Sequence, residues 1–185
     1  GRDISSTLDL PTVMDRIARH AKDLLAADHS AIFLPERAFD GGAEVFRAIV
    51  AEGEDAAQVK DAAIVAGVGI IGSIIANGRA EFVNDAGRDP RAVQIAGTPE
   101  DSDERLMVAP LRAGKTVKGA MAVWRTGGKP FQDSELEFLM GLSKQERKTG
   151  RSYQELIDLG YIEIEPLTYI RGRSIPNQYI IVDEA

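Results

Sequence analysis

Charged side chains gather in one polar stretch of the chain, residues 84–104, which separates two apolar segments. Its arginines could each hold an anionic ligand through two parallel hydrogen bonds, and Asp89-Pro90-Arg91 favours a turn that gathers the charges. The alternative is that these charges pair with one another and with solvent. Two further candidates, Arg105 and Met107, lie where the next predicted strand begins. The expected ligand-binding residues are Asp85, Arg88, Asp89, Arg91, Arg105 and Met107.

Two glycine motifs imitate nucleotide-binding sequences without the context that those sequences need. GVGIIG at residues 67–72 has the G-x-G-x-x-G spacing, but a dinucleotide site needs a preceding strand and a βαβ unit. AGKT at residues 113–116 imitates the end of a Walker A loop, but Ala109 stands where the first glycine belongs. We therefore predict a glycine turn that opens a helix at the first motif and a hairpin turn at the second.

The chain has no cysteine and two histidines, His20 and His29. The absence of cysteine excludes disulfides, thiolate nucleophiles and zinc–thiolate sites. Two isolated histidines without a matching carboxylate cluster predict no metal site. Because we find no nucleophile with a base, no acid–base pair and no metal cluster, we expect no enzymatic activity.

The composition is that of an acidic globular protein. The formal net charge of −7 leaves no basic excess to neutralise phosphates, so we expect neither nucleic acid nor a membrane as a partner. A hydrophobic content of 44% is enough for a core, and no apolar run reaches the ~18 residues that span a bilayer. Together with the lack of cysteine, these features predict a cytoplasmic protein.

The hydrophobic pattern predicts an α+β domain with helices packed on a mainly antiparallel sheet. Apolar residues recur every three or four positions over residues 9–27, which predicts a helix with Asp9 as its N-cap. A capping box of Ser134 and Glu137 predicts the start of a last helix that ends near residue 143. The other predicted elements are a helix over residues 69–76 that Gly78 ends, and strands over residues 30–34, 44–50, 81–83, 106–111 and 117–124.

Three segments in this order resemble GAF domains of bacterial signalling proteins. They are DLPTVMDRIARHAKDLLAADHSAIFL, GVGIIGSIIANGRAEFVNDAGRDPR and RLMVAPLRAGKTVKGAMAVWRTGGKPFQDSELEFLMGLS, within residues 4–145. The resemblance implies a GAF-like domain over residues 1–145, with a sensory pocket on one sheet face roofed by residues 84–104. It also implies pairing through the terminal helices, so we expect a homodimer.

The signatures that would name a ligand are missing from this sequence. Without cysteine the chain resembles neither the bilin-attaching nor the methionine-sulfoxide-reducing members, and Asn84-Asp85 is too short for the motif of the cyclic-nucleotide members. The ligand and any cofactor therefore stay open. A purely structural dimerisation domain, whose pocket is filled by side chains, remains an alternative.

The C-terminal residues GRSYQELIDLGYIEIEPLTYIRGRSIPNQYIIVDEA, 150–185, resemble a stretch of PhoH-like P-loop ATPases that leads into the Walker B strand. The resemblance implies that Asp183 would help to hold Mg²⁺ and Glu184 would polarise the attacking water. No phosphate-binding loop stands upstream, so we expect residues 146–185 to be an inactive fragment that adds a short αββ appendage. The alternative function is an ATP-binding or ATP-hydrolysing PhoH-like protein, incomplete here.

Overall fold

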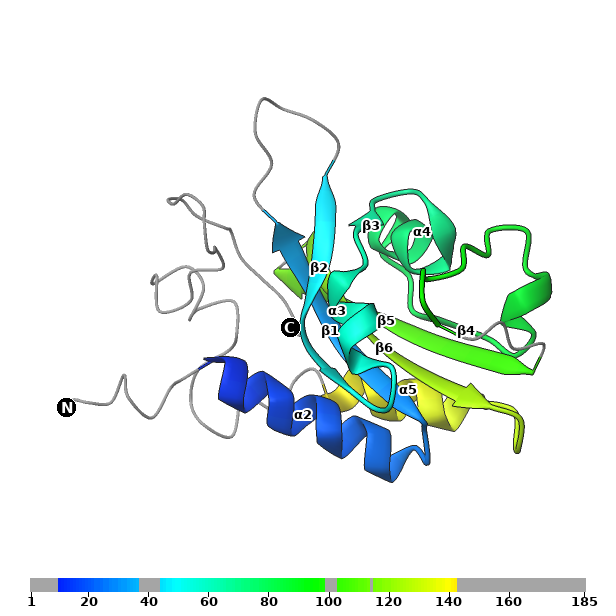
Figure 1. Ribbon diagram of the computed structural model, residues 1–185. Coiled ribbons are helices and arrows are strands. Elements are labelled where there is room, and N and C mark those ends of the chain that lie inside the picture. The colour runs from blue at the N-terminus through cyan, green and yellow to red at the C-terminus, as the bar shows by residue number, and fades with distance from the viewer. Residues whose placement is uncertain (1–9, 37–43, 99–102, 114, 143–185) are drawn as a thin grey trace.

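The computed structural model describes residues 10–36, 44–98, 103–113 and 115–142 (Figure 1). Several predictions fall outside these residues: the Asp9 cap, the αββ appendage, and the positions of Asp183 and Glu184. Within the described residues the chain forms helices packed on a sheet, which confirms the α+β prediction.

Over the described residues the sheet has six strands in the order β3-β2-β1-β6-β5-β4, and every neighbouring pair is antiparallel. The long strands β1, β5 and β6 form its centre, and the short strands β3 and β4 form its edges. The strands are β1 His29–Glu36, β2 Val45–Glu52, β3 Ile64–Val65, β4 Glu81–Val83, β5 Glu104–Ala113 and β6 Thr116–Thr126. The β5–β6 hairpin therefore contains the AGKT motif, as predicted.

Helices α2, Leu10–Leu24, and α5, Asp133–Leu142, pack on one face of the sheet (Figure 1). Because side chains alternate along a strand, Ile32 and Leu34 of β1 point to this face. They meet the apolar stripe of α2, which includes Met14 and Ala18, both fully buried. This first core joins the two terminal helices to the centre of the sheet.

The opposite face carries α3, Ala56–Asp61, and α4, Gly69–Asn77. Ala31 and Phe33 of β1 point to this face, and the Phe33 ring packs edge-on against Trp124 with a centroid distance of 6.5 Å. The isoleucines of α4 fill the space above them, and Ile74 is fully buried. This second core leaves the sheet beneath α4 lined by buried apolar side chains.

The G-x-G-x-x-G motif forms a turn and the first part of α4, as predicted. The N–H of Gly67 donates to the carbonyl of Gly72 at 2.8 Å. A Cβ on Gly72 would lie 2.2 Å from the backbone oxygen of Val65, so only glycine allows this approach. The helix ends at Gly78, whose φ of 74° gives the left-handed C-cap. The strands before and after α4, β3 and β4, lie at opposite edges of the sheet and run antiparallel, so within the described residues they form no βαβ unit around the motif.

Two predicted helix boundaries need correction. Helix α2 ends at Leu24 rather than near residue 27, because Ala26 adopts a φ of 50° and closes the helix with a Schellman-type pair of hydrogen bonds. Helix α5 begins at Asp133, and the carboxylate of Glu135 accepts the N–H of Gln132 at 3.0 Å. The N-terminal cap therefore lies two residues before the predicted Ser134 and Glu137, and only the half of a capping box in which Glu135 reaches back to Gln132 is formed.

Besides the short 3-10 helix Ala86–Arg88, two elements were not predicted from the sequence, α3 and β3. Helix α3 buries Val59, but with six residues it is too short to show a helical period in the sequence. Strand β3 has two residues, which pair with Val45 and Phe46 of β2. Both lie between β2 and α4, and both owe their place to tertiary packing rather than to local pattern.

Candidate functional site

Residues 84–98 fold back over the face that carries α3 and α4. They follow the edge strand β4 and contain a short 3-10 helix, Ala86–Arg88. Ala86 and Ile95 pack into the second core, and Gly97 lies close to the Gln58 side chain of α3. The predicted roof over this face is therefore present in the structure over these residues.

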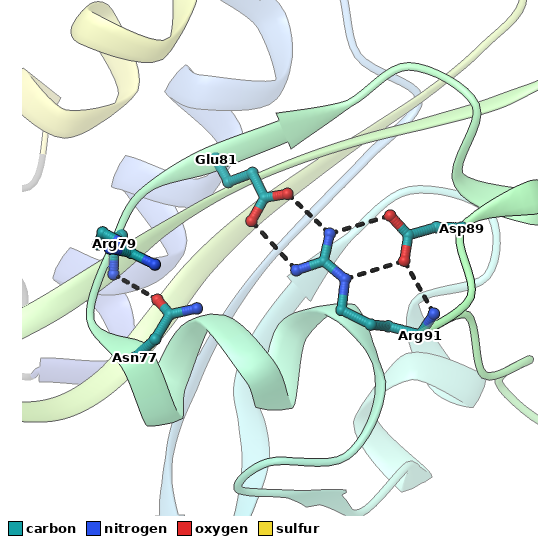
Figure 2. A network of polar contacts seen from close by, with 5 residues as sticks. All are labelled: Asn77, Arg79, Glu81, Asp89 and Arg91. Carbon is teal, nitrogen blue, oxygen red and sulfur yellow. Dashed lines mark hydrogen bonds and ion pairs between the residues drawn. The ribbon is translucent and has the colours of Figure 1, made fainter.

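Arg91 binds two carboxylates at once, that of Glu81 on the edge strand β4 and that of Asp89 in its own loop (Figure 2). The contact with Glu81 holds the loop to the sheet edge. Its Nη1 and Nη2 donate to the two carboxylate oxygens of Glu81 at 3.1 and 2.7 Å. Its Nε and Nη2 donate to the two carboxylate oxygens of Asp89, both at 2.9 Å. The backbone N–H of Arg91 also donates to Asp89, at 2.8 Å. We call Glu81, Asp89 and Arg91 the arginine clamp.

The electrostatics of the arginine clamp follow from this geometry. The hydrogen bond from the Arg91 side chain holds the pKa of the Asp89 carboxyl below its usual value. The hydrogen bonds to Asp89 and then Glu81 raise the pKa of Arg91, so the guanidinium stays charged. Two carboxylates around one guanidinium leave the clamp with a net formal charge of −1. An anionic ligand would therefore have to displace one of the carboxylates to reach Arg91.

The structure places the other predicted site residues differently. Arg88 lies 3.7 Å from Asp85 in a solvent-exposed pair. The guanidinium of Arg105 donates to three backbone carbonyls, including that of Asn84 at 2.9 Å. Met107 is fully buried in the first core, on the side of α2 and α5, and thus on the face opposite the loop. A ligand-binding role for these six residues stays a prediction.

Two residues of this region were missed by sequence reasoning, Glu81 and Asn84. Glu81 supplies half of the clamp, and the Asn84 side chain makes two hydrogen bonds with the backbone of Phe131. Glu81 is a charged residue in a short predicted strand, which could have drawn attention to it. Nothing in the sequence indicates that it pairs with Arg91, ten positions away. The partner of Asn84 lies 47 positions away, beyond any local pattern.

The histidines and acidic residues of the described chain do not gather into a metal centre. No group of three or more His, Asp or Glu side chains there could hold a metal ion. His20 is exposed on α2, and His29 accepts the backbone N–H of Asp55 through Nε2 at 3.1 Å. In the same part of the chain, no helix has both the length and the apolar character needed to cross a bilayer.

The family model of the GAF domain matches residues 9–145, most of the chain. This chain belongs to the GAF family. It resembles the GAF domain of a phosphoenolpyruvate-protein phosphotransferase from Coxiella burnetii, with a TM-score of 0.62 and 17% identity over 77% of this chain and 87% of that one. It also resembles the free methionine-R-sulfoxide reductase of Neisseria meningitidis, with a TM-score of 0.60 and 17% identity over 76% of this chain and 77% of that one. At such identities the likeness shows the fold alone, and this fold includes an enzyme.

Part of the chain is similar to Protein PhoH2 of Bacillus subtilis (strain 168), with 52% identity over 50 residues. This stretch is 27% of the present chain and 10% of that protein. The predicted resemblance to PhoH-like proteins is thereby confirmed, over a small part of the relative's length. The boundaries between a GAF domain at residues 1–145 and a PhoH-like segment at residues 146–185 stay a prediction.

Proposed function

We propose that this GAF domain is a non-catalytic regulatory module of a cytoplasmic signalling protein. It binds a small anionic ligand or a partner at the loop of residues 84–98 and changes how its terminal helices are held. The observation that carries this proposal is the arginine clamp, because Arg91 already grips carboxylates with both edges of its guanidinium. A group that can hold two carboxylates can also hold an incoming carboxylate or phosphate in place of one of them.

The exposure of the clamp supports an exchangeable contact. The side chains of Arg91 and Glu81 are 29% and 37% exposed, so solvent reaches the ion pair. At this partial exposure the two hydrogen bonds from Arg91 to Glu81 contribute about 1.4 kcal/mol together. A ligand of moderate affinity can therefore displace Glu81 without unfolding the domain.

The terminal helices support the proposal of a homodimer. Helix α5 leaves Phe138 and Met140 exposed, and α2 leaves Leu24 exposed at its end. Large apolar side chains on neighbouring terminal helices favour association with a second copy. Replacing Phe138 with aspartate in the full chain should produce monomers in light scattering, whereas Glu137→Gln on the next position should not. A dimer that survives Phe138→Asp would contradict this interface.

The PhoH-like similarity favours a second candidate function, ATP binding. A 50-residue stretch at 52% identity supports the presence of PhoH-like sequence, and the resemblance of residues 150–185 assigns the Asp183-Glu184 pair to it. We propose that this segment is inactive, because the AGKT motif at residues 113–116 lies in the β5–β6 hairpin and not between a strand and a helix, where a phosphate-binding loop belongs. Hydrolysis of ATP·Mg²⁺ by the purified chain, abolished by Glu184→Gln, would overturn this part of the proposal.

The test of ligand binding is native mass spectrometry of the full chain. Its mass is compared with the denatured mass and measured again with ATP·Mg²⁺ and with cyclic nucleotides. We expect a retained small molecule or a nucleotide complex, weakened about tenfold or more by Arg91→Met and little changed by Arg88→Met. A bare protein that ignores every added nucleotide would leave the structural dimerisation domain as the better account.

A further inference from the structure

The segment that leads from the sheet into α5, residues 127–132, is held mainly by side chains of other elements. Gly127 and Gly128 both have positive φ, 66° and 69°, which turns their carbonyls towards Arg105. The Nε of Arg105 donates to Gly127 at 3.2 Å, and its Nη2 donates to Gly128 at 3.0 Å. We call residues 127–132 the α5 linker.

Asn84 holds the far end of the α5 linker. Its Nδ2 donates to the carbonyl of Phe131 at 3.1 Å, and its Oδ1 accepts the N–H of Phe131 at 2.7 Å. The side-chain amide thus pairs with one residue as a neighbouring strand would. The carbonyl of Asn84 in turn accepts a hydrogen bond from Arg105 at 2.9 Å. The two side chains that hold the linker, those of Arg105 and Asn84, are therefore joined at Asn84, the first residue of the loop 84–98.

Phe131 is connected to both terminal helices, α2 and α5, through Arg125. The Phe131 side chain is buried in the first core, and the guanidinium carbon of Arg125 lies 4.1 Å from the centre of its ring. Arg125 also donates to the carbonyl of Leu25, just after α2, and to the carboxylate of Glu135 in α5 at 3.0 Å. Whatever moves Phe131 therefore acts on the contacts of α2 and α5 together.

Strand β4 connects Asn84 with the arginine clamp. Glu81 of the clamp begins this strand, and Asn84 directly follows its end. The strand has only three residues and pairs on one side, with β5, so few hydrogen bonds fix its position. Glu81 of the clamp and Asn84 therefore lie three residues apart, at the two ends of a weakly fixed strand.

We propose that Asn84 is a positioning residue that couples the loop of residues 84–98 to the docking of helix α5. Opening of the arginine clamp shifts β4 and withdraws the Asn84 amide from Phe131, and α5 is then held less firmly on the sheet. The inference rests on the proposed function, since it names the route by which occupancy of the loop would reach the terminal helices. Its test needs no ligand.

The experiment is hydrogen exchange with mass spectrometry on the full chain. It compares the native protein, Arg91→Met, Asn84→Ala and the double variant. We expect Arg91→Met to raise exchange in residues 127–142 severalfold, and Asn84→Ala to raise it about tenfold, since two hydrogen bonds to Phe131 are lost. The double variant should exchange no faster there than Asn84→Ala alone, because the coupling contact is already absent.

The controls separate coupling from general loosening. Arg47→Met removes an arginine of β2 that pairs with Glu36 at 2.8 Å and donates to the carbonyl of Asp61 at 2.7 Å. Three strands separate β2 from β4, so this variant should leave residues 127–142 unchanged. If Asn84→Ala does not fold, Asn84→Asp keeps the acceptor for the N–H of Phe131 and replaces the donor with a charged oxygen that repels the Phe131 carbonyl. The inference would be overturned if Arg91→Met raised exchange in the loop but not in residues 127–142. It would also be overturned if the two substitutions raised exchange in residues 127–142 independently, so that their effects multiplied in the double variant. Binding of ATP·Mg²⁺ or a cyclic nucleotide that changes exchange in α2 but leaves residues 127–142 unchanged would overturn it too, and the proposed function would stand.

Discussion

Replacing Arg91 with lysine should open the loop of residues 84–98 without unfolding the domain. Lysine keeps the positive charge but loses the planar fork that meets Glu81 and Asp89 at the same time. The backbone N–H of residue 91 would still donate to Asp89. Arg88→Lys is the matched control, because Arg88 lies in the same loop, is 87% exposed and makes only a 3.7 Å pair.

The expected magnitude follows from the hydrogen bonds of the clamp. The guanidinium makes four of them to carboxylate oxygens, at 2.7 to 3.1 Å. An ammonium can restore one to each carboxylate, so about half are lost. At this partial exposure each is worth about 0.7 kcal/mol. The total of about 1.4 kcal/mol corresponds to roughly tenfold more frequent opening.

The assay is native-state hydrogen exchange of the loop amides. The N–H of Asp89 donates to Ala86 at 3.2 Å, and the N–H of Ala92 donates to Asp89 at 2.9 Å, so both report whether the loop is closed. Amides of the first core, in β1 and α2, serve as the reference for global unfolding. We expect faster exchange in the loop alone.

The pH dependence gives a second readout. Arg91 lowers the pKa of Asp89, so the clamp contributes its full stability above the unfolded pKa of about 3.9 and loses it as pH falls through the lower, folded pKa. In Arg91→Lys the folded pKa should be lowered less, so loop protection should lose less in total as pH falls, and the loss should be complete at a higher pH. The reasoning is refuted if Arg91→Lys and Arg88→Lys exchange alike at every pH, or if the first core loosens as much as the loop.

Three further predictions concern stability in urea unfolding. Gly72→Ala should destabilise the domain by more than about 3 kcal/mol because its Cβ would meet a backbone oxygen at 2.2 Å, whereas Gly141→Ala, with open space in α5, should stabilise it by about 0.5 to 1 kcal/mol. Ala26→Gly should stabilise by about 1 kcal/mol, since the φ of 50° at this helix end disfavours alanine; a loss of stability would contradict this. The hydrogen bond with Asp15, and then burial, raises the pKa of Glu52, so Glu52 adds stability below its unfolded pKa that is lost as pH rises through the folded pKa. The Glu52→Gln variant should therefore become more stable relative to the native protein as pH rises, by less than about 1 kcal/mol. An equal effect of this substitution at all pH values would count against the interaction of Glu52 with Asp15.

Several elements were predictable because their signal is local. The period of apolar residues fixes α2, whose stripe includes Met14 and Ala18, and Gly78 ends α4 where the pattern expects it. Alternation gives the strands, although β5 and β6 extend beyond the predicted residues because pairing in the hairpin continues past the apolar run. Errors of two or three residues at α2 and α5 come from Ala26 and Gln132, which take capping roles that their residue types do not favour.

The candidate site was predictable only in part. A cluster of opposite charges in one loop indicates ion pairs, and Asp89 and Arg91 do pair, two positions apart. Glu81 could not be assigned to Arg91 from sequence, because it belongs to a different element. Met107 was expected near the ligand, but the alternation of β5 turns it into the first core.

The sequence by itself determined the family, the antiparallel α+β architecture and the glycine turn before α4, because each depends on local period, turn chemistry or the order of motifs. The tertiary structure alone decided that Arg91 closes its loop onto Glu81, and that Asn84 grips Phe131 from 47 positions away. The physical reason is that a polar side chain can satisfy its hydrogen bonds with any group brought near it. Only the folding of the sheet selects which group that is.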